Sequence, residues 1–180
     1  MKKITMMFAA VICCAMTAIV FSSCGDDESP AATDRTPVAA AMEYKMELGD
    51  QMLALFNMTI EYYDSDGTLK SEPMTQNTWT KKVRAKLPVT LGMRVRGQVK
   101  PGVDIDSQEK IFCSYGYSCN GYAVSATDLV VGNIENNGSS TSYEVSSETK
   151  AEWVQHIISG FAGFLVDFDA NGRATSSRWK

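Results

Sequence analysis

The sequence predicts an all-β fold, an antiparallel β-sandwich of the Ig-like or Greek-key type with one short α-helix near residues 150-159. The main evidence is that apolar and polar side chains alternate over most of the chain after residue 41, because a half-buried strand exposes every second side chain. Residues that favour turns, mainly Gly, Pro, Asn and Asp, separate these alternating runs. About eight strands arranged in this way are typical of a sandwich.

In the first half of the domain, the alternation indicates strands at residues 42–48, 52–62, 79–87 and 89–100. Lys81 interrupts the apolar side of the third run. Gly97 interrupts that of the fourth run, which indicates a β-bulge or the close approach of another segment. Turns are predicted at Asp64-Ser65-Asp66-Gly67 and at Pro101-Gly102.

In the second half, strands are expected at residues 111–119, 122–131, 143–145, 161–168 and 174–179. The segment 133–142 is rich in Asn, Gly and Ser and is expected to be a polar loop. Asn171-Gly172 predicts a hairpin turn of type I′, because these residues tolerate the positive φ angles that this turn requires.

The predicted helix has both a start signal and a stop signal. Thr149 and Glu152 have the spacing of a capping box, in which each side chain binds a free backbone N–H group at the helix start. Trp153 and Ile157, and also Val154 and Ile158, lie at helical spacing and predict an apolar stripe. Gly160 is expected to end the helix.

Two sheet architectures fit this pattern of elements. A sandwich is favoured because the strands vary in length and the connection at residues 101–106 is long enough to cross between two sheets. A lipocalin-like β-barrel is the alternative, because a helix shortly before the final strands also fits that arrangement.

The cysteines Cys113 and Cys119 are predicted to be free, buried thiols. In one extended strand at roughly 3.3 Å per residue they lie about 20 Å apart, which is too far for a disulfide. Only a reversal of the chain near Gly116 would bring the two sulfur atoms together.

The N-terminal segment has the features of an export signal. Lys2 and Lys3 precede an uncharged apolar run over residues 4–21, and this run ends in the small residues before Cys24. The segment Val20-Phe21-Ser22-Ser23-Cys24 resembles the lipobox of bacterial lipoproteins. The resemblance implies that residues 1–23 are a signal peptide, that lipid is added to Cys24, and that this lipid holds the chain to a membrane. A plain signal anchor with an unlipidated cysteine is the alternative.

The residues after this cysteine are acidic. Asp26, Asp27 and Glu28 form a patch that resembles the surface-export signal of Bacteroidetes lipoproteins, which implies an outer-membrane, cell-surface location. Residues 24–41 lack an apolar period and are predicted to be a flexible acidic tether. Residues 42–180 are expected to form a single β domain.

Composition and motifs argue against several classes of function. The formal net charge is -4 and no Lys/Arg cluster follows the N-terminus, so nucleic acid is not expected as a partner. The lone histidine, His156, is expected on the exposed side of the helix, and no nucleophile elbow accompanies it. No cofactor or metal is predicted. The calcium-like run at residues 167–172 is interpreted as a hairpin, because Arg178 occupies the position of the final Glu ligand.

We therefore expect a non-enzymatic binding or accessory domain, with a glycan or an envelope protein as its partner. Tyr115, Tyr117 and Tyr122 are the candidate ligand-binding residues, because flat aromatic rings on a sheet can stack on sugars or on a partner protein. Tyr115 and Tyr117 share a strand face with Ile111 and the two cysteines, so packing in the core is the default role of these two and ligand binding the alternative. A structural or assembly subunit of an envelope complex or pilus, and a small hydrolase, are alternative functions.

Overall fold

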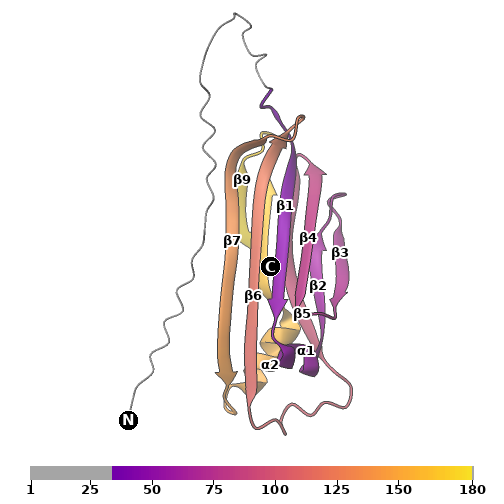
Figure 1. The fold of residues 1–180 in the computed structure, drawn as a ribbon, viewed down its shortest axis with the longest axis vertical. Helices are drawn as coiled ribbons and strands as arrows, with labels where there is room; N and C mark the ends of the chain where they lie inside the picture. Colours follow the sequence, from indigo (N-terminus) through magenta and orange to yellow (C-terminus); the bar gives the residue numbers. More distant parts are fainter. Residues whose placement is uncertain (1–33, 180) are drawn as a thin grey trace, which may run out of the picture. The chain divides into compact units, whose positions relative to one another are not determined.

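The computed structural model describes residues 34–179, so the expected signal peptide and residues 24–33 of the expected tether lie outside the described residues. Eleven helices and strands follow one another within the described part of the chain (Figure 1). In chain order they are β1 (Pro37–Leu48), α1 (Asp50–Leu55), β2 (Phe56–Tyr63), β3 (Leu69–Met74), β4 (Thr78–Lys86), β5 (Val89–Val99), β6 (Ile111–Ser125), β7 (Val130–Val145), α2 (Lys150–Ser159), β8 (Phe161–Phe168) and β9 (Ala174–Arg178).

The strands form two antiparallel sheets, which confirms the predicted all-β sandwich. The first sheet has the order β4-β1-β6-β7, and the second has the order β3-β2-β5-β8-β9. The lipocalin-like barrel is wrong, because the sheets are not joined into a closed ring: β4 and β7 end the first sheet, and β3 and β9 end the second. Figure 1 shows the two layers, with both helices at the same end of the domain.

The connections explain how a single chain builds both layers. The pairs β2–β3, β6–β7 and β8–β9 are hairpins within a sheet, whereas the other connections cross between the sheets. The connection from β5 to β6 is one of those that cross between the sheets, as was predicted from its length. The core lies between the layers and contains mainly Met, aromatic and branched side chains from the inner faces of both sheets.

The first helix is a correction to the predicted strand at 52–62. Residues 50–55 form α1, and only from Phe56 onward is the chain extended. Met52 and Leu55 are both buried, which a single helical turn achieves because residues three apart share a face. The apolar spacing at the start of this segment therefore fitted a strand, although the chain there is a helical link between the two sheets.

The strand β7 overturns two further expectations. The predicted polar loop at 133–142 lies within β7, and the predicted strand at 122–131 is divided between β6 and β7 by a turn. β7 pairs with β6 from Val130 to Val145, so backbone hydrogen bonds hold it in place although its side chains are mostly small and polar. The strand β3 was not predicted at all, because five of its six residues are exposed or half-buried.

Residues 37–41, which the sequence placed in the tether, lie in a strand, because β1 begins at Pro37. These residues therefore belong to the β domain: Ala39, Ala40 and Ala41 are all buried, and Ala40 is part of the core between the sheets. A run of alanines has no polar–apolar alternation, so the sequence gives no signal for this part of the strand.

The second helix is confirmed at Lys150–Ser159 and ends at Gly160, whose φ angle of 110° is open to glycine. Trp153 and Ile157 are buried as expected and Val154 is half-buried, whereas Ile158 is exposed because it lies beside the buried stripe. The capping box is wrong: the Thr149 hydroxyl makes no cap hydrogen bond and lies instead 2.9 Å from the hydroxyl of Ser146. An oxygen engaged with the preceding turn is not free to accept from the helix start.

Close packing explains the interruption at Gly97. A Cβ atom at this position would lie 2.5 Å from Cγ2 of Ile157 and 2.9 Å from the sulfur of Met58. The helix α2 therefore rests directly on β5, and a glycine is required where the two approach.

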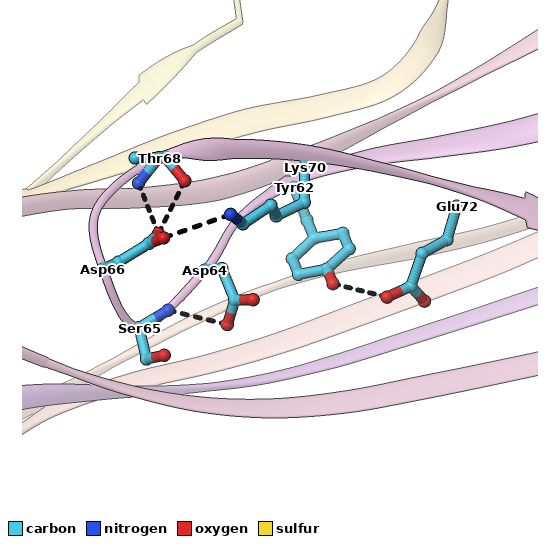
Figure 2. Close-up of polar contacts among 7 residues, drawn as sticks. All are labelled: Tyr62, Asp64, Ser65, Asp66, Thr68, Lys70 and Glu72. Carbon is cyan, nitrogen blue, oxygen red and sulfur yellow. Dashed lines mark hydrogen bonds and ion pairs between the residues drawn. The ribbon is translucent and has the colours of Figure 1, made fainter.

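The acidic turns at the hairpins use their carboxylates for hydrogen bonds within the loop. Asp66 accepts from the backbone N–H and the hydroxyl of Thr68 and forms an ion pair with Lys70 (Figure 2). Asp169 likewise accepts from the backbone N–H groups of Asn171 and Arg173. Both are hairpin turns, as predicted.

The type I′ assignment is wrong. The N–H of Gly172 closes the turn on the carbonyl of Asp169, so the central residues are Ala170 and Asn171. Neither has a positive φ angle, whereas a type I′ turn needs two, and Gly172 with its φ of 73° follows them. Within residues 34–179, no group of three or more His, Cys, Asp or Glu side chains is placed to hold a metal ion.

The two cysteines of the domain are free and buried, as predicted. Both lie in the uninterrupted strand β6, so no reversal at Gly116 brings them together. Burial raises the pKa of the Cys119 thiol well above its ordinary value.

Candidate functional site

The two long edges of the sandwich are built differently, and this difference locates the candidate site. At the edge formed by β3 and β4, Glu72 of β3 joins the two sheets. Its carboxylate accepts from the indole of Trp79 at 3.0 Å and from the ammonium of Lys81 at 2.8 Å, both on β4. It also accepts from the hydroxyl of Tyr62 at 2.5 Å (Figure 2). This network closes the edge and explains why Lys81 interrupts an apolar face.

The stability of the domain is expected to fall in acid because of Glu72. The hydrogen bond from Lys81, followed by those from Tyr62 and Trp79, lowers the pKa of Glu72 from its ordinary 4.5 to about 2. A carboxyl group whose pKa is lower in the folded state stabilises that state above pH 4.5, and the contribution is lost as the pH falls toward 2. Urea unfolding at a series of pH values measures this loss.

Glu72→Gln provides the control for this prediction. The variant should be less stable than the wild type near neutral pH, and its stability should depend less on pH between 4.5 and 2. Glu148→Gln, at an exposed position before α2, should leave the wild-type pH dependence intact. Identical acid profiles of wild type and Glu72→Gln would contradict the role assigned to the network.

The opposite edge, between β7 and β9, opens into a cleft of about 840 Å³. This volume lies within the range of about 300–1,000 Å³ that is common for small-molecule sites. Side chains from both sheets and from α2 line the cleft: Tyr115, Tyr117, Asn137, Ser139, His156, Ala162, Gly163, Phe164, Ser176, Ser177 and Arg178.

Small polar side chains explain why this edge stays open. Asn137 and Ser139 lie on the inner face of β7, because they pair with the inward-facing Cys119 and Tyr117 of β6. Across the cleft, Ser176 of β9 pairs with the buried Val166 of β8. These side chains are too short to fill the space between the sheets, whereas apolar residues at the same positions would close it.

Two of the predicted tyrosines line the cleft. The ring of Tyr115 packs edge-on against Phe161 at 4.8 Å, and the ring of Tyr117 stacks on Phe164 at 6.1 Å. Both tyrosines are half-buried. Each ring therefore contributes to the core and to the wall of the cleft, so the two roles considered from the sequence apply together.

The third predicted tyrosine, Tyr122, lies elsewhere. Successive side chains of a strand point to opposite faces, and an odd spacing from Tyr115 and Tyr117 places Tyr122 on the outer face of the sheet. Its hydroxyl donates to Glu43 at 3.1 Å, and the ammonium of Lys82 lies 6.0 Å from its ring. The three tyrosines therefore do not form one surface.

Two charged or titratable side chains of the cleft were not selected from the sequence. His156 lies on the exposed side of α2, as expected, with its ring 6.0 Å from that of Phe161. Arg178 pairs with Phe164 across the hairpin and so shares its inner face. Nothing in the local sequence marks either residue, because the cleft forms only when α2 and β9 meet β6.

The cleft is lined by polar and aromatic groups. Aromatic rings, an amide, hydroxyls, an imidazole and a guanidinium are available, and no carboxylate is among the side chains that line it within the described residues. The carboxylate of Glu135, toward one end of β7, accepts from the hydroxyl of Ser176 at 3.1 Å and so links the two sheets there. Such a set can hydrogen-bond a ligand rich in hydroxyl groups.

Comparison with known proteins gives no relative: no family model matches, and neither the curated proteins nor the solved structures yield a match to this chain. The fold and the cleft are therefore the observations on which a function can be argued. The proposed lipidation at Cys24 and the export signal Asp26, Asp27 and Glu28 lie outside the described residues. Among residues 34–179, no helix is both long and apolar enough to cross a membrane.

Proposed function

We propose that this protein is a lipoprotein held on the cell surface by lipid on Cys24, with a domain that binds a glycan without chemically altering it. The lipobox-like segment and the acidic residues behind it support the anchor and the outer-membrane location. Several acyl chains on one cysteine would hold the protein firmly, since a single chain gives only marginal attachment. Incorporation of labelled palmitate that is lost in Cys24→Ala tests the anchor.

The cleft between β7 and β9 supports the choice of a glycan. Sugars present apolar C–H faces beside many hydroxyl groups, so they are bound by aromatic rings together with amide and hydroxyl side chains. Tyr115 and Tyr117 supply the rings, and Asn137, Ser139 and Ser176 supply the polar groups. The combination of these groups in one cleft of about 840 Å³ is the observation that carries the proposal.

Binding without turnover is favoured over hydrolysis by the charges of the cleft. Glycoside hydrolysis generally uses a pair of carboxyl groups on either side of the scissile bond. The side chains that line the cleft in the described part of the chain include an imidazole and a guanidinium, but no such pair. We therefore infer that the domain retains its ligand or presents it to other envelope components.

Replacement of Tyr117 by alanine is expected to weaken glycan binding about tenfold or more. Loss of the ring removes a stacking contact worth about 0.5–1.5 kcal/mol beyond the buried area, and about 1.4 kcal/mol corresponds to tenfold in affinity. A glycan array with the purified protein would select a ligand, and isothermal titration with that oligosaccharide would measure the dissociation constants.

Two variants control this experiment. Tyr117→Phe keeps the ring that stacks on Phe164 and should retain most of the affinity. Tyr122→Ala removes an aromatic ring from the opposite face of the same strand and should leave binding unchanged. The proposal fails if the folded protein binds no oligosaccharide, or if Tyr122→Ala weakens binding as much as Tyr117→Ala does.

A further inference from the structure

The free edges of the two sheets differ in how well they are protected from pairing with another strand. Natural proteins protect such edges with charges, prolines or short strands. The edge strand β3 has six residues and contains Pro73, and β9 has five residues and ends at Arg178. The edge strand β4 carries four basic side chains: Lys81, Lys82, Arg84 and Lys86.

The fourth edge, β7, lacks this protection over most of its length. It has 16 residues and is hydrogen-bonded to β6 on one side only. Between Glu135 and Glu144 lie eight uncharged residues, 136–143, and none of them is proline. A register shift interrupts the pairing of β7 with β6 only near the start of β7, between Val131 and Glu135. The long uncharged part therefore presents a regular row of free backbone groups.

We propose that β7 pairs with β7 of a second copy of this chain, antiparallel and about a two-fold axis. The two four-stranded sheets then form one continuous sheet across the dimer. A two-fold interface must be complementary to itself, since the same patch meets its own copy. The sequence of β7 meets this requirement when Ser139 lies opposite Ser139 of the second copy.

In this register the side chains that face each other are compatible. Glu135 lies opposite Tyr143, and Ile134 lies opposite Glu144, so no carboxylate faces another. A shift by one residue would set inward-facing residues opposite outward-facing ones, which a continuous pleated sheet does not allow. The centre of the interface is formed by small side chains, which allow close approach: Gly138, Ser139, Ser140 and Thr141.

The same register also gives a role to two exposed apolar side chains. Ile134 is 52% exposed and Phe112 is 53% exposed. Phe112 of β6 pairs with Glu144, and Ile134 of the second copy would lie on the other side of that same glutamate. Pairing therefore brings the two apolar groups to one face of the joined sheet, where they cover each other in part.

Crosslinking of the full chain, purified in detergent, tests this pairing. Ser139→Cys places a thiol opposite its own copy, and mild oxidation should produce a covalent dimer. Thr175→Cys, at an exposed position of the edge strand β9, should produce none. Cys113 and Cys119 are 0% and 1% exposed, so they should not take part.

Lysines on the edge provide an independent measurement. Ser140→Lys combined with Ser142→Lys adds charge to the outer face of β7 and should shift the protein mass in sedimentation equilibrium from two chains to one. A wild-type protein that stays monomeric, or Ser139→Cys that crosslinks no better than Thr175→Cys, would overturn the proposal. So would a dimer that persists with both lysines. The pairing does not depend on the glycan site, so either proposal can fail alone.

Discussion

Replacing Gly92 by alanine is expected to lower the free energy of unfolding by at least about 3 kcal/mol, the upper part of the range for overpacked cores. A Cβ atom on this residue would lie 2.3 Å from the carbonyl oxygen of Phe164 and 2.9 Å from Cα of Leu165. Both atoms belong to the backbone of β8, so no side-chain rotation can remove the clash. The strands β5 and β8 would have to separate where they pair.

The matched control for this substitution is Gly116→Ala in β6. A Cβ atom there would lie 3.5 Å from Cβ of Ser140 and 3.6 Å from the carboxylate of Glu47, which are ordinary contacts. An alanine in a strand interior costs less conformational entropy than a glycine, so this variant should be as stable as the wild type or slightly more stable. Urea unfolding followed by circular dichroism compares the two, and equal stabilities would contradict the assigned contact.

The elements that the sequence predicted correctly are those in which burial alternates along the strand. In β5, Leu91, Met93 and Val95 are buried while Arg94 and Arg96 point away, so the period of two is visible in the residues themselves. The strand β8 and the helix α2 are recognisable for the same reason, because each buries one face or one stripe.

The elements that the sequence missed are stabilised mainly by the backbone. β3 and β7 lie at sheet edges, where side chains such as Ser139 and Ser140 need not be apolar. What holds these strands is the hydrogen bonding of the N–H and C=O groups to the neighbouring strand, which every residue type except proline can provide. No local sequence pattern indicates this strand pairing, since it depends on a partner strand elsewhere in the sequence.

The candidate site was predictable only in part. Tyr115 and Tyr117 stand out as aromatic residues on one face of one strand, and the cleft contains both. The alternation of side chains along a strand could have placed Tyr122 on the opposite face, because it lies an odd number of residues from Tyr115 and Tyr117. Asn137 and Arg178 join the site through the β6–β7 and β8–β9 hairpins and the packing of the two sheets, none of which can be read from composition or spacing.

The buried side chain of Tyr44 joins the sheets at the same place as Gly92. Its hydroxyl accepts from the backbone N–H of Gly92 at 3.0 Å and donates to the backbone carbonyl of Tyr63, also at 3.0 Å. Tyr44 is on β1, whereas its partners are on β5 and β2, so a side chain of one sheet satisfies two backbone groups of the other. Burial raises the pKa of Tyr44 well above its ordinary value.

Tyr44→Phe is therefore expected to destabilise the domain by about 2–4 kcal/mol. The change keeps the ring in the core but leaves the buried N–H of Gly92 and the half-buried carbonyl of Tyr63 without their partner, and a buried group left without a partner costs about 1–3 kcal/mol. Chemical unfolding measures the total. Hydrogen exchange followed by NMR should locate the effect, because the amide of Gly92 loses its acceptor.

Tyr122→Phe is the matched control, since its hydroxyl bonds to the half-exposed Glu43 on the outer face. Loss of this one part-buried hydrogen bond should cost less than about 1 kcal/mol, because water reaches the half-exposed carboxylate of Glu43 and replaces the missing partner. The bridge between the sheets is refuted if Tyr44→Phe costs no more than Tyr122→Phe, or if the Gly92 amide keeps its protection in Tyr44→Phe. Because Tyr44 and Gly92 are in contact, Tyr44→Phe combined with Gly92→Ala should cost less than the sum of the single changes.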